Sequence, residues 1–220
     1  MTPASRRRPG LLVTFEGPEG SGKTTLIRAL TERLLQAGCE PVVLREPGGT
    51  DIGERIREVL LDPATTGMCA ETELLLMAAS RAQLVREKIR PALEADLMVL
   101  CDRFADASVA YQGAGRALGP EVVARCNEVA LGGLVPDLTF LCLLPPEAGH
   151  ARLAGRPREI NRLDRESQAF HGRVYDAYRA MAASGDPRFC VIDAAAKPAA
   201  MLEQALARLR LLEHGLLKYI

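Results

Sequence analysis

Five short apolar segments, separated by longer stretches with helical periodicity, are the feature of this sequence that most restricts its fold. They are residues 11–15, 42–44, 97–101, 138–144 and 189–192. Strands that read as continuous apolar runs are buried on both faces, as in parallel sheets covered by helices on each side. The pattern therefore predicts an α/β fold with a five-stranded parallel sheet and helices on both faces.

The length and the charge of the chain limit its organisation and its partners. A chain of 220 residues with 48% hydrophobic content is expected to form a single domain over 1–220, with residues 1–10 as a disordered basic tail. Lys plus Arg and Asp plus Glu number 28 each, so no overall field attracts nucleic acid or an anionic membrane. The apolar run after the tail is too short for a signal or membrane segment. We expect neither nucleic acid nor a membrane as a partner.

The cysteines and histidines show no metal-binding pattern. Six cysteines, at positions 39, 69, 101, 126, 142 and 190, contain no Cys-x-x-Cys pair, and several lie in apolar runs. They are expected to be buried free thiols in a reducing cytoplasm. The three histidines lack the spacing of zinc ligands, so no zinc site is predicted.

A glycine-rich loop with Gly-Lys-Thr at its end joins the first predicted strand to the first predicted helix. In this context the backbone N–H groups and the helix N-terminus bind phosphate, Lys23 reaches the β- and γ-phosphates of ATP, and Thr24 binds Mg²⁺. A simple glycine-rich turn is the alternative. The predicted ATP-binding residues are Gly17, Pro18, Glu19, Gly20, Ser21, Gly22, Lys23, Thr24 and Thr25.

Glu19 is unusual within that loop. A carboxylate beside a triphosphate is repelled unless a metal ion, an arginine or a hydroxyl group contacts it. We therefore expect Glu19 to face a second ligand, and the alternative is a side chain that points into solvent.

Polar residues at the ends of the second and third strands indicate where that second ligand binds. The carboxyl edge of an open α/β sheet is the usual binding edge, so Glu46 and Arg57 line either a pocket or a plain turn there. At the end of the third strand, Asp102 is expected to hold Mg²⁺ and Arg103 an acceptor phosphate. A mutual ion pair between Asp102 and Arg103 is the alternative.

The stretch 71–93 has a helical period that leaves two special residues beside each other. Met77 and Arg81 lie four positions apart, on a face other than the expected core face of Leu74, Ala78, Ala82, Val85 and Ile89. A soft apolar surface beside a guanidinium group suits a nucleotide base. For Met77 alone, a place in the core is the competing interpretation.

An arginine-rich stretch broken by Gly155 and Pro157 follows the fourth strand. We interpret residues 152–163 as a lid that closes on phosphates and supplies positive charge during transfer. A solvated helix face is the alternative. The arginines are Arg152, Arg156, Arg158, Arg162 and Arg165.

Taken together, these segments resemble those of the bacterial thymidylate kinase family. The similar motifs run from residue 11 onward, in the family's order: FEGPEGSGKTT, REPGGT, AASRAQLV, CDRF followed by AYQG, and NRLD followed by FHGRV. The resemblance implies a P-loop kinase fold with a short lid, and a cytoplasmic homodimer. It also implies Mg²⁺-dependent transfer of the ATP γ-phosphoryl group to dTMP, giving dTDP.

The resemblance also implies roles for individual residues. Glu19 would lie by the deoxyribose 3′-hydroxyl, Arg81 by the thymine ring and Arg103 by the acceptor phosphate. Tyr111 would occupy the space of a ribose 2′-hydroxyl. Glu46, Arg57 and Gln112 match further acceptor-binding positions, and the catalytic candidates are Lys23, Arg103, Arg156 and Arg158.

Two positions depart from the family pattern, and both fall in the acceptor site. Met77 replaces a phenylalanine that stacks on thymine, and Ala107 replaces a serine. The expected result is weaker dTMP binding unless Ser108 compensates. A kinase for another pyrimidine nucleoside monophosphate, and a P-loop ATPase or nucleotide-binding module without an acceptor, remain as alternatives.

Overall fold

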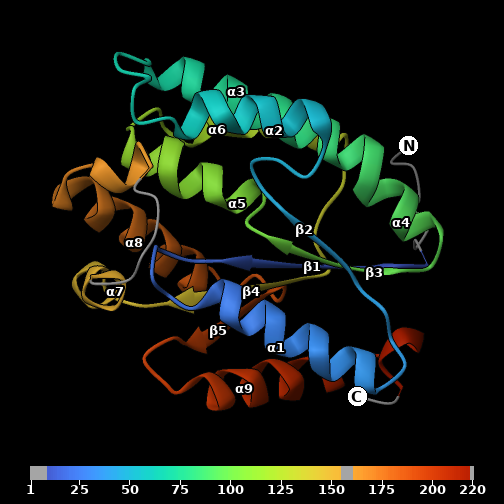
Figure 1. Cartoon of the computed structure of the whole chain (residues 1–220). Coiled ribbons are helices and arrows are strands. Elements are labelled where there is room, and N and C mark those ends of the chain that lie inside the picture. Colours follow the sequence, from blue (N-terminus) through green and yellow to red (C-terminus); the bar gives the residue numbers. More distant parts are fainter. Residues whose placement is uncertain (1–8, 155–160, 219–220) are drawn as a thin grey trace.

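The fold is described by a computed structural model that covers residues 9–154 and 161–218 (Figure 1). Its centre is a five-stranded sheet in the order β2-β3-β1-β4-β5, and every neighbouring pair of strands is parallel. The strands are β1 Leu11–Glu16, β2 Val42–Arg45, β3 Met98–Asp102, β4 Leu138–Leu143 and β5 Phe189–Asp193. The predicted α/β class, strand number and parallel direction are confirmed, with each strand within one residue of its expected position.

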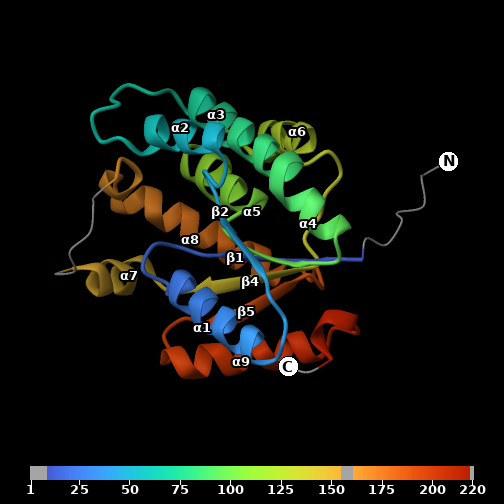
Figure 2. The ribbon, with the colours of Figure 1, turned by 45° about the vertical axis from the view of Figure 1, so that its right-hand side comes forward.

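Helices connect the strands and cover both faces of the sheet (Figure 2). The α-helices are α1 Lys23–Gln36, α2 Asp51–Leu61, α3 Ala70–Leu84, α4 Arg90–Glu94, α5 Ala105–Ser108, α6 Pro120–Leu131, α7 Pro146–Leu153, α8 Gln168–Ala183 and α9 Pro198–Arg210. Two π-helical segments, η1 Val85–Ile89 and η2 Val109–Gly115, continue α3 and α5, and the 3₁₀ turns are η3 Leu163–Arg165 and η4 Gly215–Leu217.

Side chains of the central strand β1 alternate between two apolar cores. Leu11, Val13 and Phe15 belong to a cluster with residues of α1 and α9. Leu12 belongs to a cluster on the other face, with residues of α3, η1 and α4. Because both faces of β1 are covered, all six of its residues are buried, which explains why the strand is apolar up to Glu16 apart from Thr14, whose hydroxyl hydrogen-bonds to that of Thr139 in β4.

The first helix and the long helical stretch agree with the sequence pattern, with one difference. Leu26, Ile27, Leu30 and Leu34 are the buried apolar residues of α1. Along α3 and η1, Leu74, Ala78, Val85 and Ile89 are buried as expected, but Ala82 is only partly buried. Helix α3 packs against α2 and α6, which lie beside it in Figure 1.

All six cysteines are free thiols, as predicted, but the expectation that they are buried is wrong in part. Cys101 and Cys142 are buried because they lie on the central strands β3 and β4, whereas Cys69 is exposed because it precedes α3 in a loop. Within residues 9–154 and 161–218, no helix has the length and apolar character needed to cross a membrane.

The sheet brings the ends of three strands together at one edge. Phe15 of β1 and Arg45 of β2 both pair in register with Asp102 of β3. The strand order reverses at β1, with β3 on one side and β4 on the other. A crevice forms at such a reversal, so the loops after β1, β2 and β3 are the place to look for a ligand site.

Candidate active site

The loop between β1 and α1 is tightly folded over the end of the sheet. Gly17, Gly20 and Gly22 all have positive φ angles, of 139°, 72° and 86°. A Cβ atom at Gly20 would overlap the backbone of Gly149 in α7, so only glycine allows this approach. Helix α7 therefore packs directly on the loop.

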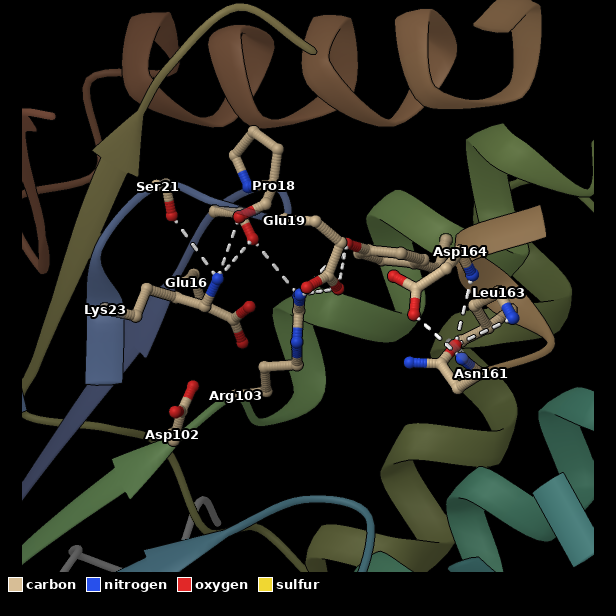
Figure 3. Close-up of polar contacts among 12 residues, drawn as sticks. Glu16, Pro18, Glu19, Ser21, Lys23, Asp102, Arg103, Asn161, Leu163 and Asp164 are labelled. Carbon is tan, nitrogen blue, oxygen red and sulfur yellow. Dashed lines mark hydrogen bonds and ion pairs between the residues drawn. The ribbon is translucent and has the colours of Figure 1, made fainter. Parts of the chain in front are cut away.

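Lys23, the first residue of α1, folds back across this loop (Figure 3). Its Nζ donates hydrogen bonds to the carbonyl oxygens of Gly17 at 3.0 Å and Pro18 at 2.9 Å, and to Ser21 Oγ at 3.3 Å. Burial, followed by the neighbouring Arg103, lowers the pKa of the Lys23 amine. The amine thus lies in the hollow of the loop, where phosphate oxygens would compete for its hydrogen bonds.

A cavity that we call the loop cavity opens beside this amine. Seven of the nine predicted ATP-binding residues line it, and Gly17 and Pro18 lie behind them as acceptors for Lys23. The lining residues are Glu19, Gly20, Ser21, Gly22, Lys23, Thr24, Thr25, Leu26, Arg152, Leu153, Ala195, Ala196, Lys197, Pro198 and Met201. The sequence prediction missed residues 195–198, although they follow the end of β5 at the same edge of the sheet, which was a usable signal.

Thr24 of the loop cavity and Asp102 of the cavity at the ends of β2 and β3 lie beside each other. Thr24 Oγ1 donates a hydrogen bond to Asp102 Oδ2 at 2.9 Å. A hydroxyl and a carboxylate suit Mg²⁺, which prefers oxygen ligands and often completes its shell with substrate phosphates and water. No cluster of three or more His, Cys, Asp or Glu residues that could hold a metal occurs in the described part of the chain. The predicted pair therefore fits an ion that arrives with a nucleotide.

A second cavity, the strand-end cavity, lies on the other side of Glu19. Its lining residues are Glu19, Arg45, Glu46, Pro47, Arg57, Leu61, Met77, Arg81, Asp102, Arg103, Ala107, Ser108, Tyr111, Gln112, Asn161 and Leu163. All the predicted acceptor-binding residues are among them. The sequence prediction missed Arg45, Pro47, Leu61, Asn161 and Leu163. Arg45 ends β2 and carried the same signal as Glu46, but the last three reach the cavity only through the tertiary fold.

Glu19 contacts groups of the strand-end cavity and does not point freely into solvent. Its Oε1 lies 2.5 Å from Arg103 Nη2 and accepts a hydrogen bond from the Tyr111 hydroxyl at 3.3 Å. Arg103 also donates to the Gly17 carbonyl oxygen and to both Tyr111 and Tyr178. The alternative of an Asp102–Arg103 ion pair is not realised, since Arg103 pairs with Glu19 while Asp102 accepts from Thr24.

Arg103 is held in an unusual backbone conformation by a residue that the sequence prediction overlooked. Its φ angle is 66°, in the left-handed region. The buried Glu16 Oε1 accepts hydrogen bonds from the backbone N–H groups of Phe104 at 2.7 Å and Ala107 at 3.1 Å, and Oε2 accepts from the Tyr178 hydroxyl at 2.8 Å. Burial, followed by the carboxylate of Asp106, raises the pKa of Glu16 to about 8.

Arg81 is almost completely buried in the wall of the strand-end cavity. It donates to Glu46 Oε2 at 2.8 Å and to Asn127 Oδ1 at 2.7 Å, and its Nη2 contacts Phe104 O and Ser108 Oγ, both at 3.1 Å. Burial raises the pKa of Glu46 to about 7 in spite of the pairing with Arg81. Among the residues that the structure describes, none hydrogen-bonds to the buried Glu46 Oε1. Glu46 itself is one of the lining residues of this cavity.

Met77 and Arg57 both line the same cavity. Met77 lines it and also packs, partly buried, against a core cluster around Phe170 and Tyr178, so both sequence interpretations describe part of its environment. Arg57 Nη1 donates to the Pro47 carbonyl oxygen at 2.9 Å. The cis peptide bond before Pro47 turns the chain at the end of β2, and Glu46 and Arg57 line a pocket instead of a plain turn.

The structure describes only residues 152–154 and 161–163 of the predicted lid. The catalytic candidates Arg156 and Arg158 lie outside the described residues. Arg152, at the end of α7, lines the loop cavity and Arg165 is exposed. Arg162 instead donates to Glu73 Oε2 at 2.7 Å and to the Leu60 carbonyl oxygen at 3.0 Å, so it joins the end of this stretch to α2 and α3.

Sequence comparisons agree with this geometry. The thymidylate kinase family model matches residues 15–205, a range that contains both cavities. The chain belongs to the thymidylate kinase family. Curated thymidylate kinases from Latilactobacillus sakei and Pseudomonas fluorescens are 48% and 49% identical to it over 199 and 197 residues, and one from Bacillus pumilus is 46% identical over 198 residues. Each alignment covers 90% of this chain and 93% of the relative.

Proposed function

We propose that this family member is a dTMP kinase, which transfers the γ-phosphoryl group of ATP to dTMP and releases ADP and dTDP. The observation that carries the proposal is the position of Glu19, which lines both cavities. Two anionic nucleotides bound in these cavities would meet beside Glu19 and Arg103, where one phosphate can attack the other in line. Membership of the family supports the same reaction.

In this proposal, each charged group of the site offsets negative charge on one of the two substrates. Lys23 exchanges its contacts with the loop carbonyls for the β- and γ-phosphates of ATP. Arg103 exchanges Glu19 for the acceptor phosphate. Glu19, once released, accepts a hydrogen bond from the deoxyribose 3′-hydroxyl, and Tyr111 fills the space of a 2′-hydroxyl. Mg²⁺ held by Thr24 and Asp102 would neutralise charge on the transferring phosphates.

The base of dTMP is assigned to the inner part of the strand-end cavity. Met77 covers one face of the ring, and Arg81, Ser108 and Gln112 offer polar groups to its edge. Ser108 is nearly fully buried, and its Oγ accepts a hydrogen bond from Arg81 Nη2 at 3.1 Å. Ser108 thereby holds the arginine in place, a contact that Ala107, which has no hydroxyl group, cannot make. Glu46 and Arg57 complete the acceptor site.

We further propose that the protein is a cytoplasmic homodimer that associates through α2, α3 and α6. These helices lie side by side at one end of the molecule (Figures 1 and 2). Their exposed apolar side chains are Ile52, Val59, Leu75, Val122 and Val129, and the side chain of Val129 is 74% exposed. Val129→Lys should yield a monomer in size-exclusion chromatography with light scattering, whereas an unchanged dimer would reject this surface.

The activity is tested by ADP release from ATP and Mg²⁺, with and without dTMP, dUMP, dCMP, UMP or AMP. Release that depends on dTMP is the expected result. Preference for a different pyrimidine monophosphate would mean that Met77 and Ala107 have changed the acceptor. Release without any acceptor, or ATP binding without release, would replace the proposal with a hydrolase or a nucleotide-binding module.

A further inference from the structure

Glu73 is a buried carboxylate that lies behind the wall of the strand-end cavity. Glu73 is 0% exposed, and its carboxylate accepts hydrogen bonds from Gln112, Arg116 and Arg162. Gln112 lines the cavity, Arg116 follows η2, and Arg162 comes from the end of the arginine-rich stretch. A buried carboxylate is tolerated when ionic and hydrogen-bonding partners surround it in this way.

The two oxygens of Glu73 share Arg116, but Gln112 contacts only one of them and Arg162 only the other. Oε1 accepts from Gln112 Nε2 at 2.8 Å. Oε2 accepts from Arg116 Nη2 at 2.8 Å and Arg162 Nη2 at 2.7 Å, while Arg116 Nε lies 3.2 Å from both oxygens. Burial alone would raise the pKa of Glu73, but hydrogen bonds from Arg116 and Gln112 hold it below its ordinary value. Glu73 is therefore ionised at neutral pH.

An ionised carboxylate can only accept hydrogen bonds, and this fixes which way the Gln112 amide is turned. The NH₂ end must face Glu73, because the carbonyl end would place two acceptors against each other. Gln112 is 1% exposed and lines the cavity together with Arg81 and Ser108. Its carbonyl oxygen is the end that remains for a ligand.

We propose that Glu73 is a positioning residue that fixes the Gln112 amide with its carbonyl toward the acceptor base, so that the cavity selects pyrimidines with an N3–H group. Thymine and uracil carry a donor at N3, whereas N3 of cytosine is an acceptor. A fixed carbonyl would bond to the first two and repel the third. The inference rests on the proposed function, since it concerns the same acceptor cavity.

The test compares dTMP with dCMP in the wild-type protein and in Glu73→Gln. In the variant, Arg116 and Arg162 attract the new carbonyl oxygen, which leaves an NH₂ group toward residue 112 and favours rotation of the Gln112 amide. The expected result is a dTMP-to-dCMP ratio of kcat/KM that falls roughly tenfold to a hundredfold. Both acceptors are measured on one preparation, so the folded fraction cancels from the ratio.

Two further variants separate positioning from stability. Arg116→Gln removes an ionic partner of Glu73 but leaves the bond to Gln112, so its ratio should stay within about twofold of the wild type. In a Gln112→Ala background, Glu73→Gln should not change the ratio any further. A Glu73 that only stabilises the fold would lower kcat/KM for both acceptors equally in every background, and that result would overturn the proposal.

The outcomes also separate this inference from the proposed function. A wild-type protein without dTMP-dependent ADP release would reject the function itself. An active wild-type protein whose ratio is unchanged by Glu73→Gln would reject only the role of Glu73.

If Glu73→Gln does not fold, ¹⁵N side-chain amide spectra of the wild type decide, with the Gln112 signals assigned by their loss in Gln112→Ala. Its NH₂ signals should stay in place when dTMP is added, and large shifts would mean that this end faces the base.

Discussion

Arg103 Nη2 lies 2.5 Å from Glu19 Oε1, so the cation expected to bind the acceptor phosphate is paired with a carboxylate from the loop after β1. Both side chains are partly shielded, with 16% and 29% of their surface exposed. The pair keeps Arg103 extended toward the junction of the two cavities, and exchanging one anion for another needs little movement of the guanidinium group.

Replacing Arg103 with lysine should weaken use of the acceptor much more than use of ATP. Lysine keeps the charge but loses the planar fork that grips Glu19 or a phosphate group. We expect kcat/KM for dTMP to fall about tenfold to a hundredfold, with the KM for ATP nearly unchanged. Steady-state kinetics with each substrate varied would check this, and the exposed Arg179→Lys is the matched control. An equal loss for both substrates would contradict the assignment of Arg103.

Asp102→Asn should raise the Mg²⁺ concentration needed for activity. The carboxylate accepts from Thr24 and contributes charge that an amide lacks. The half-saturating Mg²⁺ concentration at fixed ATP should rise about tenfold or more. A titration of the rate with Mg²⁺ measures it. An unchanged Mg²⁺ dependence would show that Asp102 does not hold the ion.

Lys23→Ala should remove phosphoryl transfer while the fold persists. The lysine amine is the cation in the hollow of the loop, and its partners are carbonyl and hydroxyl oxygens of the same loop. Loss of one such donor to transferring phosphates costs at least about a hundredfold in kcat. Circular dichroism would establish that the variant is folded, and normal turnover by a folded variant would refute the predicted role.

Met77→Phe should lower the KM for dTMP. An aromatic ring at this position of the strand-end cavity would stack on the base, with a gain of about 1 kcal/mol, or roughly fivefold in KM. Leu35→Phe on the exposed side of α1 is the control, since residue 35 lines neither cavity and lies outside the proposed dimer surface. A KM that stays the same or increases would indicate that Met77 serves mainly the core.

The stability of the protein should decrease between about pH 4.5 and pH 8 because of Glu16. Its pKa is raised from 4.5 to about 8 on folding, so within this window the folded state keeps a proton that the unfolded state has released. The contribution of Glu16 to the free energy of unfolding is fully present below pH 4.5 and is lost as the pH rises through 8. One pKa unit corresponds to about 1.4 kcal/mol, so the total effect is a few kcal/mol.

Urea unfolding at several pH values would measure this effect in Glu16→Gln. The amide resembles the protonated carboxyl group, so the variant should show a flatter dependence of unfolding free energy on pH than the wild type. Glu203→Gln, an exposed change on α9, is the control. Parallel pH profiles for the wild type and Glu16→Gln would rule out a raised pKa at this position.

The sequence was informative where burial leaves a repeating pattern. The strands β1, β3 and β4 are covered on both faces and read as mainly apolar runs, with one threonine in β1 and one in β4, so their positions follow directly. The π-helical turns of η1 and η2 leave no such mark, because the apolar spacing continues through them. For this reason the sequence does not reveal where helix α3 ends and η1 begins.

Site residues were predictable where they belong to a loop or a strand end, as Lys23 and Arg103 do. Glu16 and Glu73 were overlooked because a charged residue in a sequence is normally expected at the surface. Only the fold brings Tyr178 to Glu16, and Arg162 to Glu73, across 162 and 89 positions of the chain. Long-range pairing of this kind has no local pattern.

The close packing of Gly20 against Gly149 has a genetic consequence. Position 149 lies in α7, far along the chain from the phosphate-binding loop, yet any side chain there would push on the backbone of Glu19. Mutations at Gly149 should therefore share the phenotype of mutations in the loop itself. A screen for loss of function would group positions 20 and 149 together, although they are distant on the gene map.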